Sequence, residues 1–589
     1  MKSFLKYTLA TIVGVIITGA IFFLILFASI GSMISSQQDK TVNIKPNTVL
    51  KIELDQVITD RSPQNPFENF DFSSFKPKKS LGLNDILDNI KKAGKDDDIK
   101  GIYLELSSIP AGMATTEEIR EALIEFKKTD KFIICYSDNY TQKSYYLGSV
   151  ADKMYMNPAG RVYLTGLQSN IMFFKEGLDR LGVEPQIVRH GKFKSAIEPF
   201  TKNQMSPENR EQINAYIGSL WNQMAKGISQ ERGIEVEKIN QMTNELTHRS
   251  ADAAVKHGLI DSLTYKDDIL EKLNKKSEID KDNPRFVSLS KYTNVPKIKD
   301  YTGLAENKIA VVYAMGSVVM GEGEEGSIGS ERISRAIRKA RKDSSIKAIV
   351  FRVNSGGGSA LASEVIWREA KLAAKEKPFI ASLGDVAASG GYYIVSPADT
   401  IMASPNTITG SIGVFGLFFN GKEFLNDKLG VHVDVVKTHK YADLGSPFRS
   451  MKEDERQIIK DQIVQTYDTF VERVANGRNM TEDKVDEIGQ GRVWSGADAK
   501  ERGLVDMFGG LEEAIELAAQ TAKIEKYRTV GLPELKDPFE QFMKNLSGNV
   551  KASIIKDEMG DSYKYYKEFE HIKDMQGVQA RIPYRINVY

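Results

Sequence analysis

Short apolar runs and amphipathic stretches alternate along most of the chain. Residues 346–353 and 379–383 are rich in β-branched and other apolar side chains and predict buried strands. Residues 360–374, which lie between them, carry apolar side chains at helical spacing. Because strands that alternate with helices build βα units, we expect an α/β fold with a largely parallel sheet.

The N-terminal apolar run is longer than these strands and helices. Residues 9–30 contain no charged side chain, and a helix of this length rises about 33 Å, enough to cross a bilayer. A cleaved signal peptide usually has a shorter apolar region, and a buried core helix is rarely uninterrupted for so long. Lys2 and Lys6 precede the run, whereas the first charge after it is Asp39. We therefore predict a transmembrane anchor, with residues 1–8 in the cytoplasm and the rest of the chain outside the inner membrane.

The sequence contains an internal repeat. Residues 98–108 (DIKGIYLELSS) resemble residues 345–355 (SIKAIVFRVNS), and the same offset pairs the tyrosines at 145–146 with those at 392–393. Self-similarity that keeps one register over such a distance indicates two copies of one structural unit.

The repeat sets the domain boundaries that we predict. The segment between the copies is rich in Lys, Asp, Asn and Pro, which is typical of a helix followed by a connecting segment. For the chain beyond the second copy we expect a surface helix without identifiable chemistry. The predicted order is a first copy at 45–265, a linker at 266–307, a second copy at 308–527 and a C-terminal extension at 528–589.

The composition is that of an ordinary folded protein. Hydrophobic residues make up 41% of the chain and charged residues 27%, and 80 Lys and Arg nearly balance 79 Asp and Glu. A net charge of +1 provides no cationic field, so we expect no nucleic-acid partner. The single cysteine, Cys135, excludes an intrachain disulfide, and the sequence has no CxxC or HExxH motif to hold a metal. We therefore expect no cofactor.

The two copies differ at two positions that matter for chemistry. The second copy has Ser389 in a turn of small residues, DVAASGGYY, between a predicted strand and a predicted helix, whereas the first copy has Gln142 there. The first copy has Lys194 in GKFKSAIEPF, whereas the second copy has Ala442 at the matching place. Each copy therefore keeps one half of a possible Ser/Lys pair.

Such a pair works only if the lysine is neutral. A serine hydroxyl is a weak nucleophile until a base removes its proton, and an ammonium group cannot do so. Desolvation lowers a lysine pKa from about 10.4 toward neutrality when no carboxylate compensates, so the site should be apolar and should keep Lys194 away from Glu198. The structural alternatives are a serine in tight packing and a solvated surface lysine.

Backbone amides for the oxyanion are also in place. Residues 354–359 (NSGGGS) follow a predicted strand and precede a predicted helix, so their N–H groups lie at the positive end of that helix. Gly390, directly after Ser389, offers a second amide. Donors of this kind are each worth about 3 kcal/mol in the transition state.

These motifs resemble a known family. The segments RVNSGGGS, DVAASGGYY, TITGSIGVFG and GKFKSAIEPF, with the tandem repeat and the anchor, are similar to bacterial signal peptide peptidase A in its long, duplicated form. The resemblance implies tandem ClpP/crotonase-like domains and a serine protease with a Ser/Lys dyad. It implies Ser389 as nucleophile, Lys194 as general base, Ser411 as the serine that orients the lysine, and Gly357 and Gly390 as oxyanion donors.

The resemblance also implies substrates, partners and location. It implies degradation of cleaved signal peptides and other apolar peptides by a homotetramer at the bacterial inner membrane, with a single span in the lipid bilayer and the catalytic part on the periplasmic side. The sequence departs from the family at Gly356, where the family usually has a proline, and glycine there removes a fixed φ.

Three other interpretations use the same residues. The run 321–326 (GEGEEG) fits a dinucleotide-binding fingerprint, but its three glutamates would repel a pyrophosphate. The turn around Ser389 is close to the GxSxG elbow, so His432 or His439 could serve as the base of a Ser-His esterase. Finally, two degenerate crotonase-like units could form a non-catalytic membrane scaffold.

Overall fold

The computed structural model describes most of the chain. It covers residues 42–62, 81–279, 284–296, 305–324, 326–535 and 577–582, together with most positions from 4 to 21 and the pairs 70–71 and 76–77. The described positions from 4 to 21 are largely helical. Within these ranges no helix combines the length and the apolar character that crossing a membrane requires. Residues 22–30 of the predicted anchor lie outside the described residues, so the anchor stays a prediction.

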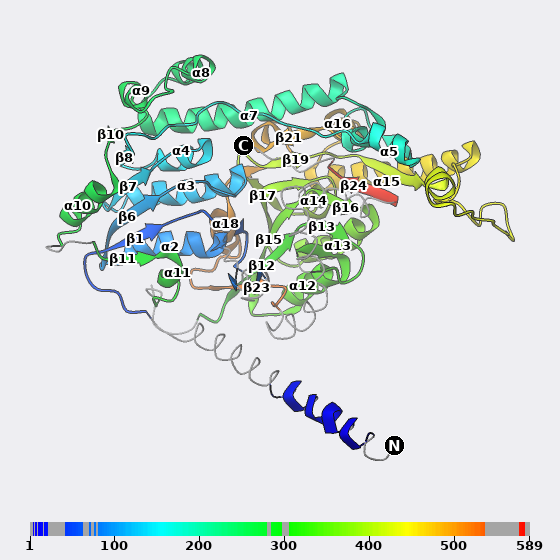
Figure 1. Ribbon diagram of the computed structural model, residues 1–589, viewed down its shortest axis with the longest axis horizontal. Coiled ribbons are helices and arrows are strands. Elements are labelled where there is room, and N and C mark those ends of the chain that lie inside the picture. The colour runs from blue at the N-terminus through cyan, green and yellow to red at the C-terminus, as the bar shows by residue number, and fades with distance from the viewer. Residues whose placement is uncertain are drawn as a thin grey trace.

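The first copy is built on a parallel six-stranded sheet (Figure 1). Its strands are buried on both sides by helices, which is why they read as nearly continuous apolar runs in the sequence. The strand order is β10 (Ser262–Leu263), β8 (Lys153–Met156), β7 (Phe132–Ser137), β6 (Ile99–Glu105), β1 (Thr48–Ile52) and β11 (Phe286–Ser288). Its helices include α2 (Leu83–Lys95), α3 (Met113–Lys127), α4 (Gln142–Gly148), α8 (Val236–Glu245) and α9 (Ala251–Lys256). The predicted linker adds β11 to this sheet and contains α10 (Lys266–Lys276) and α11 (Leu289–Tyr292).

The second copy repeats this plan in an eight-stranded sheet. The predicted strands and helix are confirmed as β15 (Ile346–Ser355), β17 (Phe379–Ala388) and α13 (Ala360–Ala374). The sheet also contains β12 (Lys308–Met315), β18 (Thr400–Ala403), β19 (Ile408–Gly410), β21 (Val493–Ser495), β22 (Met507–Phe508) and β23 (Arg528–Leu532). Its other helices include α12 (Ser330–Lys342), α14 (Gly390–Val395), α15 (Glu453–Arg478), α16 (Glu482–Ile488), α17 (Gly496–Glu501) and α18 (Leu511–Thr521).

A third sheet joins the two copies. Its strand order is β14 (Ser327–Gly329), β13 (Ser317–Val319), β16 (Gly357–Ser359), β24 (Gly577–Arg581), β20 (Val414–Asn420) and β9 (Glu184–His190). β9 belongs to the first copy, yet it pairs antiparallel with β20 of the second copy along its whole length. This pairing brings the chain after β9 to the second copy. Helix α5 (Lys175–Leu181) precedes β9, and helix α6 (Glu198–Thr201) follows it.

Helix α7 (Pro207–Arg232) spans both copies (Figure 1). Its N-terminal half packs Ile213, Tyr216 and Leu220 against residues of β17, β19 and β21. Its C-terminal half packs into the core of the first copy. The two copies therefore follow each other in the sequence, but elements of the first copy pack against the second in space.

The described parts of the C-terminal extension are strands, whereas residues 536–576, where the sequence predicts a surface helix, lie outside the described residues, so that helix stays a prediction. β23 pairs with β12 at the edge of the second sheet, and β24 lies inside the third sheet. Both strands pair with partners more than a hundred residues away in the chain.

Candidate active site

The structure brings Lys194 and Ser389 together. The Lys194 Nζ lies 2.8 Å from the Ser389 Oγ, within hydrogen-bond distance, and both residues are fully buried. One side chain comes from each copy. The contact therefore exists only because β9 crosses onto β20.

Ser389 lies in the sharp turn between β17 and α14. Its backbone has φ 55° and ψ −117°, an uncommon conformation for a residue with a side chain. The turn is held by hydrogen bonds from the Ser389 amide to the Gly410 carbonyl and from the Tyr393 amide to the Ser389 carbonyl, both at 2.8 Å. Such a turn projects the hydroxyl away from the sheet, as in other strand-to-helix nucleophile turns.

Lys194 follows β9 and is held by the second copy. The Phe193 amide donates to the Gln490 carbonyl at 2.8 Å. Gly491 has φ 79°, and a Cβ built there would come within 2.7 Å of the Lys194 Cα. The lysine backbone can approach so closely only because Gly491 has no side chain. Sequence reasoning missed this contact, for which the GQGR segment is a weak signal.

Burial lowers the pKa of Lys194 well below the ordinary lysine value. Among the residues that the structure describes, no carboxylate opposes this shift, and Glu198 is directed elsewhere. Its Oε2 accepts hydrogen bonds from the Ser206 amide at 3.1 Å and from the Asn209 side chain at 3.0 Å. The start of α7 therefore holds the nearby acid away from the amine, and the neutral form of Lys194 is favoured.

Ser411 is the third residue at the amine. The Lys194 Nζ lies 3.1 Å from the Ser411 Oγ and donates to the Ser411 carbonyl at 3.2 Å. Ser411 is itself fixed, since its amide donates to the Arg492 carbonyl at 2.6 Å. These contacts hold the amine toward Ser389.

The two predicted oxyanion residues are neighbours. A Cβ built on Gly357 would lie 2.7 Å from the Gly390 amide nitrogen. Gly357 has φ 94°, but its amide donates to the Ser355 hydroxyl at 3.0 Å. The Gly390 amide is therefore the more available of the two predicted donors.

The remaining residues of the alternative interpretations are not brought to Ser389. His432 and His439 are exposed, whereas Ser389 is fully buried. Gln142 is buried in the first copy, where its Oε1 accepts from the amides of Thr165 and Gly166. In the GEGEEG loop, Glu322 forms an ion pair with Arg335.

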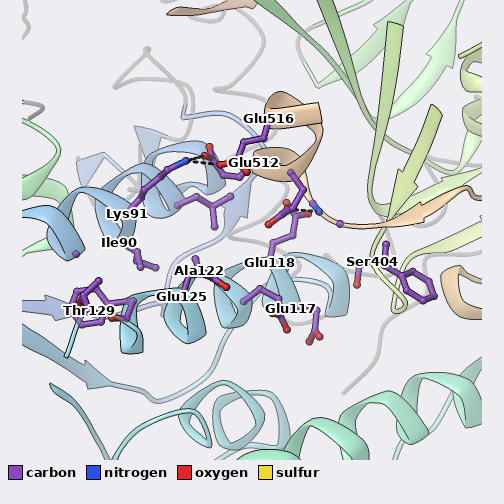
Figure 2. Close-up of a pocket in the computed structure, with 18 of the residues that line it drawn as sticks. Ile90, Lys91, Glu117, Glu118, Ala122, Glu125, Thr129, Ser404, Glu512 and Glu516 are labelled. Atoms are coloured by element: carbon purple, nitrogen blue, oxygen red, sulfur yellow. Dashed lines mark hydrogen bonds and ion pairs between the residues drawn. The ribbon is translucent and has the colours of Figure 1, made fainter. Parts of the chain in front are cut away.

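A cavity of about 750 Å³ lies elsewhere, between α2, α3 and α18 (Figure 2). It is lined by many carboxylates, and neither Lys194 nor Ser389 reaches it. Lys91 binds Glu512 and Glu516 across it at 3.0 and 3.1 Å, and Glu118 accepts from the Leu511 amide. These contacts join the first copy to the last helix of the second, so the cavity marks an interface between copies.

Comparison with known families matches peptidase family S49 twice, at residues 125–280 and 371–525. The chain belongs to peptidase family S49. The first S49 match contains Lys194 and the second contains Ser389. The predicted internal repeat and the predicted family are thereby confirmed.

Three S49 relatives cover most of the chain. Protease 4 of Haemophilus influenzae is 38% identical over 75% of this chain and 73% of its own length. Protease 4 of Salmonella typhi is 37% identical over 80% of this chain and 77% of its own. The chloroplastic serine protease SPPA of Arabidopsis thaliana is 34% identical over 85% and 74%. This S49 chain is therefore a serine peptidase, and we retain neither the scaffold nor the Ser-His esterase.

Among solved structures, ClpP1 from Listeria monocytogenes aligns with the S49 chain at 14% identity. The alignment covers 34% of this chain and 92% of ClpP1, with a TM-score of 0.23.

Proposed function

We propose that this S49 peptidase is a membrane-anchored endopeptidase that degrades released signal peptides with a Ser389/Lys194 dyad. The observation that supports it best is the 2.8 Å contact between a buried hydroxyl and a buried amine whose pKa is lowered. Each copy is proposed to have a ClpP/crotonase-like fold.

The proposed reaction follows from this contact. Neutral Lys194 takes the Ser389 proton while the Oγ attacks the carbonyl carbon of the peptide bond, and the carbonyl electrons move onto its oxygen. The Gly390 amide, with the Gly357 region, donates to this oxyanion. Lys194 then gives the proton to the leaving nitrogen as the C–N bond breaks. A water molecule that Lys194 deprotonates hydrolyses the acyl-enzyme and frees Ser389.

The proposed location rests on the apolar run at 9–30. A single span with two lysines before it would leave the peptidase on the periplasmic side of the inner membrane. Signal peptides released into that membrane are apolar and lie close to such a site.

The proposed homotetramer has support in an exposed segment of the second copy. The segment after Gly430 is the repeat equivalent of β9, yet it forms no strand in the described structure, and it exposes Val431, Val433, Val435 and Val436. In the first copy, the equivalent segment pairs with the other copy through β9 and β20. By the same rule, the exposed valines would pair with the first copy of a neighbouring chain, and head-to-tail contacts of this kind close rings.

The test is digestion of a synthetic signal peptide by the full chain in detergent micelles. Ser389→Ala and Lys194→Ala should both abolish cleavage, whereas Lys192→Ala, an exposed lysine two residues away, should leave it unchanged. Cleavage that survives Lys194→Ala would contradict the dyad. Cleavage of water-soluble peptides alone would contradict the proposed substrate class.

A further inference from the structure

A buried arginine of the second copy is paired with two acids of the first. Arg352 on β15 is fully buried, and its Nε lies 2.7 Å from the Asp60 Oδ1. Its Nη2 lies 2.7 Å from the Oε1 of Glu118 on α3. A charge in the interior of a protein needs such partners, so both acids satisfy Arg352. The two acids differ in what their remaining oxygens bind.

The second oxygen of Asp60 binds Asn354. The Asn354 Nδ2 donates to the Asp60 Oδ2 at 3.0 Å, and the Asn354 Oδ1 accepts from the Val386 amide at 3.2 Å. Val386 lies on β17, three residues before Ser389. Asn354 therefore bridges an acid of the first copy to the strand that leads to Ser389.

This bridge lies at a break in the β15–β17 ladder. Two residues on β15 correspond to four residues on β17 at this point, so Asn354 faces the three residues 384–386. In such a bulge the extra residues lose their ladder partners, and the strand bends. The Asn354 side chain provides the Val386 amide with an acceptor. The direction in which β17 leaves the bulge sets the position of the Ser389 turn.

Asn354 also begins the loop that contains a predicted oxyanion glycine. Its carbonyl accepts from the Gly316 amide at 3.0 Å, and the hydroxyl of the next residue, Ser355, accepts from the Gly357 amide at 3.0 Å. Asn354 therefore lies where the strand before Ser389 meets the loop with Gly357, and fixing its side chain fixes one relative to the other.

Asp60 is itself held firmly against the second copy. The neighbouring Arg61 donates to the Pro533 carbonyl at 2.7 Å, and its guanidinium lies 5.4 Å from the centre of the Tyr313 ring. Tyr313 is on β12, and Pro533 directly follows β23. A residue that positions another must be rigid, and these contacts give Asp60 that rigidity.

The repeat shows that this bridge belongs to the second copy. At the offset that relates the copies, Arg352 corresponds to Glu105 and Asn354 corresponds to Ser107. Glu105 forms an ion pair with Lys51 of its own copy at 2.8 Å. A serine side chain is short and has no amide group, so it cannot join two partners as Asn354 does. The bridge accompanies the copy that carries the proposed nucleophile.

We propose that Asp60 is a positioning residue for the reaction, which holds the β17 bulge, and with it Ser389, through Asn354. The inference rests on the proposed function, because it takes Ser389 as the nucleophile. It adds that the first copy supports the site of the second copy twice, once with Lys194 and once with Asp60.

Asp60→Asn in the full chain tests this role. An amide has a single acceptor oxygen, and the charge of Arg352 attracts it, so the new NH2 group faces the NH2 group of Asn354 and the bridge is lost. Displacement of Ser389 acts on the transition state and not on peptide binding. We expect kcat for a short apolar peptide to fall about tenfold to a hundredfold, while the KM stays unchanged.

Glu118→Gln is the matched control. Glu118 pairs with the same arginine, but its other oxygen accepts from the Leu511 amide at 2.8 Å (Figure 2). Burial raises the pKa of Glu118 to about 7, so a neutral side chain already occurs there at physiological pH. Both substitutions should lower the urea midpoint, because each removes an acid from Arg352, but only Asp60→Asn should lower kcat. Equal kcat losses in both variants, or no loss in either, would overturn the positioning role.

Asn354→Ala separates the bridge from the ion pair. It leaves Asp60 paired with Arg352 and should lower kcat as much as Asp60→Asn does. The double variant should be no slower than Asn354→Ala alone, because Asp60 then has no bridge to hold, and additive losses would overturn the proposal. If Asp60→Asn does not fold, an unchanged kcat in Asn354→Ala would overturn it.

A second measurement requires no catalysis. Hydrogen exchange at residues 384–389 should be about tenfold faster in Asp60→Asn and in Asn354→Ala than in the unsubstituted chain, and unchanged in Glu118→Gln. Equal exchange in all four chains would overturn the positioning role. Cleavage that survives Ser389→Ala would instead contradict the proposed nucleophile.

Discussion

Gln142 and Ser389 occupy the same turn in the two copies and do different work. Both follow a strand and lie where a short helix begins. Gln142 uses its side chain to hold the backbone of Thr165 and Gly166, at 3.0 and 2.8 Å. Ser389 has a strained backbone, and its hydroxyl contacts Lys194. Under the proposed function, one copy uses the turn for stability and the other for chemistry, so a duplicated unit can give up half of a site when its partner keeps it.

The largest effect is expected when the lysine is moved from the first copy to the second. Lys194→Ala should reduce kcat by about 10⁴-fold, as removal of a base from a nucleophile-base pair does. Adding Ala442→Lys should not restore activity, because position 442 is exposed and cannot give a desolvated amine. Peptide hydrolysis measured for the single and double variants checks this. Recovery in the double variant would show that the copies are interchangeable.

The pH dependence sharpens the comparison, since only Lys194 among the paired positions is a base. Burial lowers the pKa of Lys194, so the fraction of molecules with a neutral amine increases as the pH rises. This fraction reaches its maximum at a pH below the ordinary lysine pKa. We expect kcat/KM to rise about tenfold per pH unit at acid pH and to level off below about 10. A profile that is flat from acid to alkaline pH would contradict the lysine base.

Ser411 is proposed as a positioning residue for the Lys194 amine. Ser411→Ala removes one of the two contacts that hold the amine, at 3.1 Å, and should reduce kcat about tenfold to a hundredfold while the KM changes little. A loss that appears in KM alone would argue for a role in peptide binding.

The smallest effect is expected at Gly491, the glycine against which the Lys194 backbone packs. Gly491→Ala should cost about 1–3 kcal/mol in the free energy of unfolding, because it combines an unfavourable φ with the close contact to Lys194. Gly233→Ala, at a positive φ with no atom near the added methyl group, should cost only about 1 kcal/mol. Urea denaturation of both variants measures the difference. Equal losses in the free energy of unfolding would mean that the Lys194 backbone can shift away from the added methyl group without cost.

Sequence reasoning reached the strands, the helix at Ala360–Ala374 and the Ser/Lys pair because these depend on local patterns and on the repeat. It did not find that β9 pairs with β20 or that β24 enters the third sheet, since strand partners far apart in the chain leave no local signal. It missed Gly491 for the same reason, because glycine is needed there only where the distant Lys194 backbone comes close.

The order of the two reactive residues along the chain has a consequence for synthesis. The ribosome makes the lysine first, and the serine, Ser411 and Gly491 follow almost two hundred residues or more later. An incomplete chain that ends before Ser389 therefore holds the proposed base with no hydroxyl to activate. On the proposed mechanism, the dyad can form only after the chain has been made as far as Gly491, which packs against the lysine backbone.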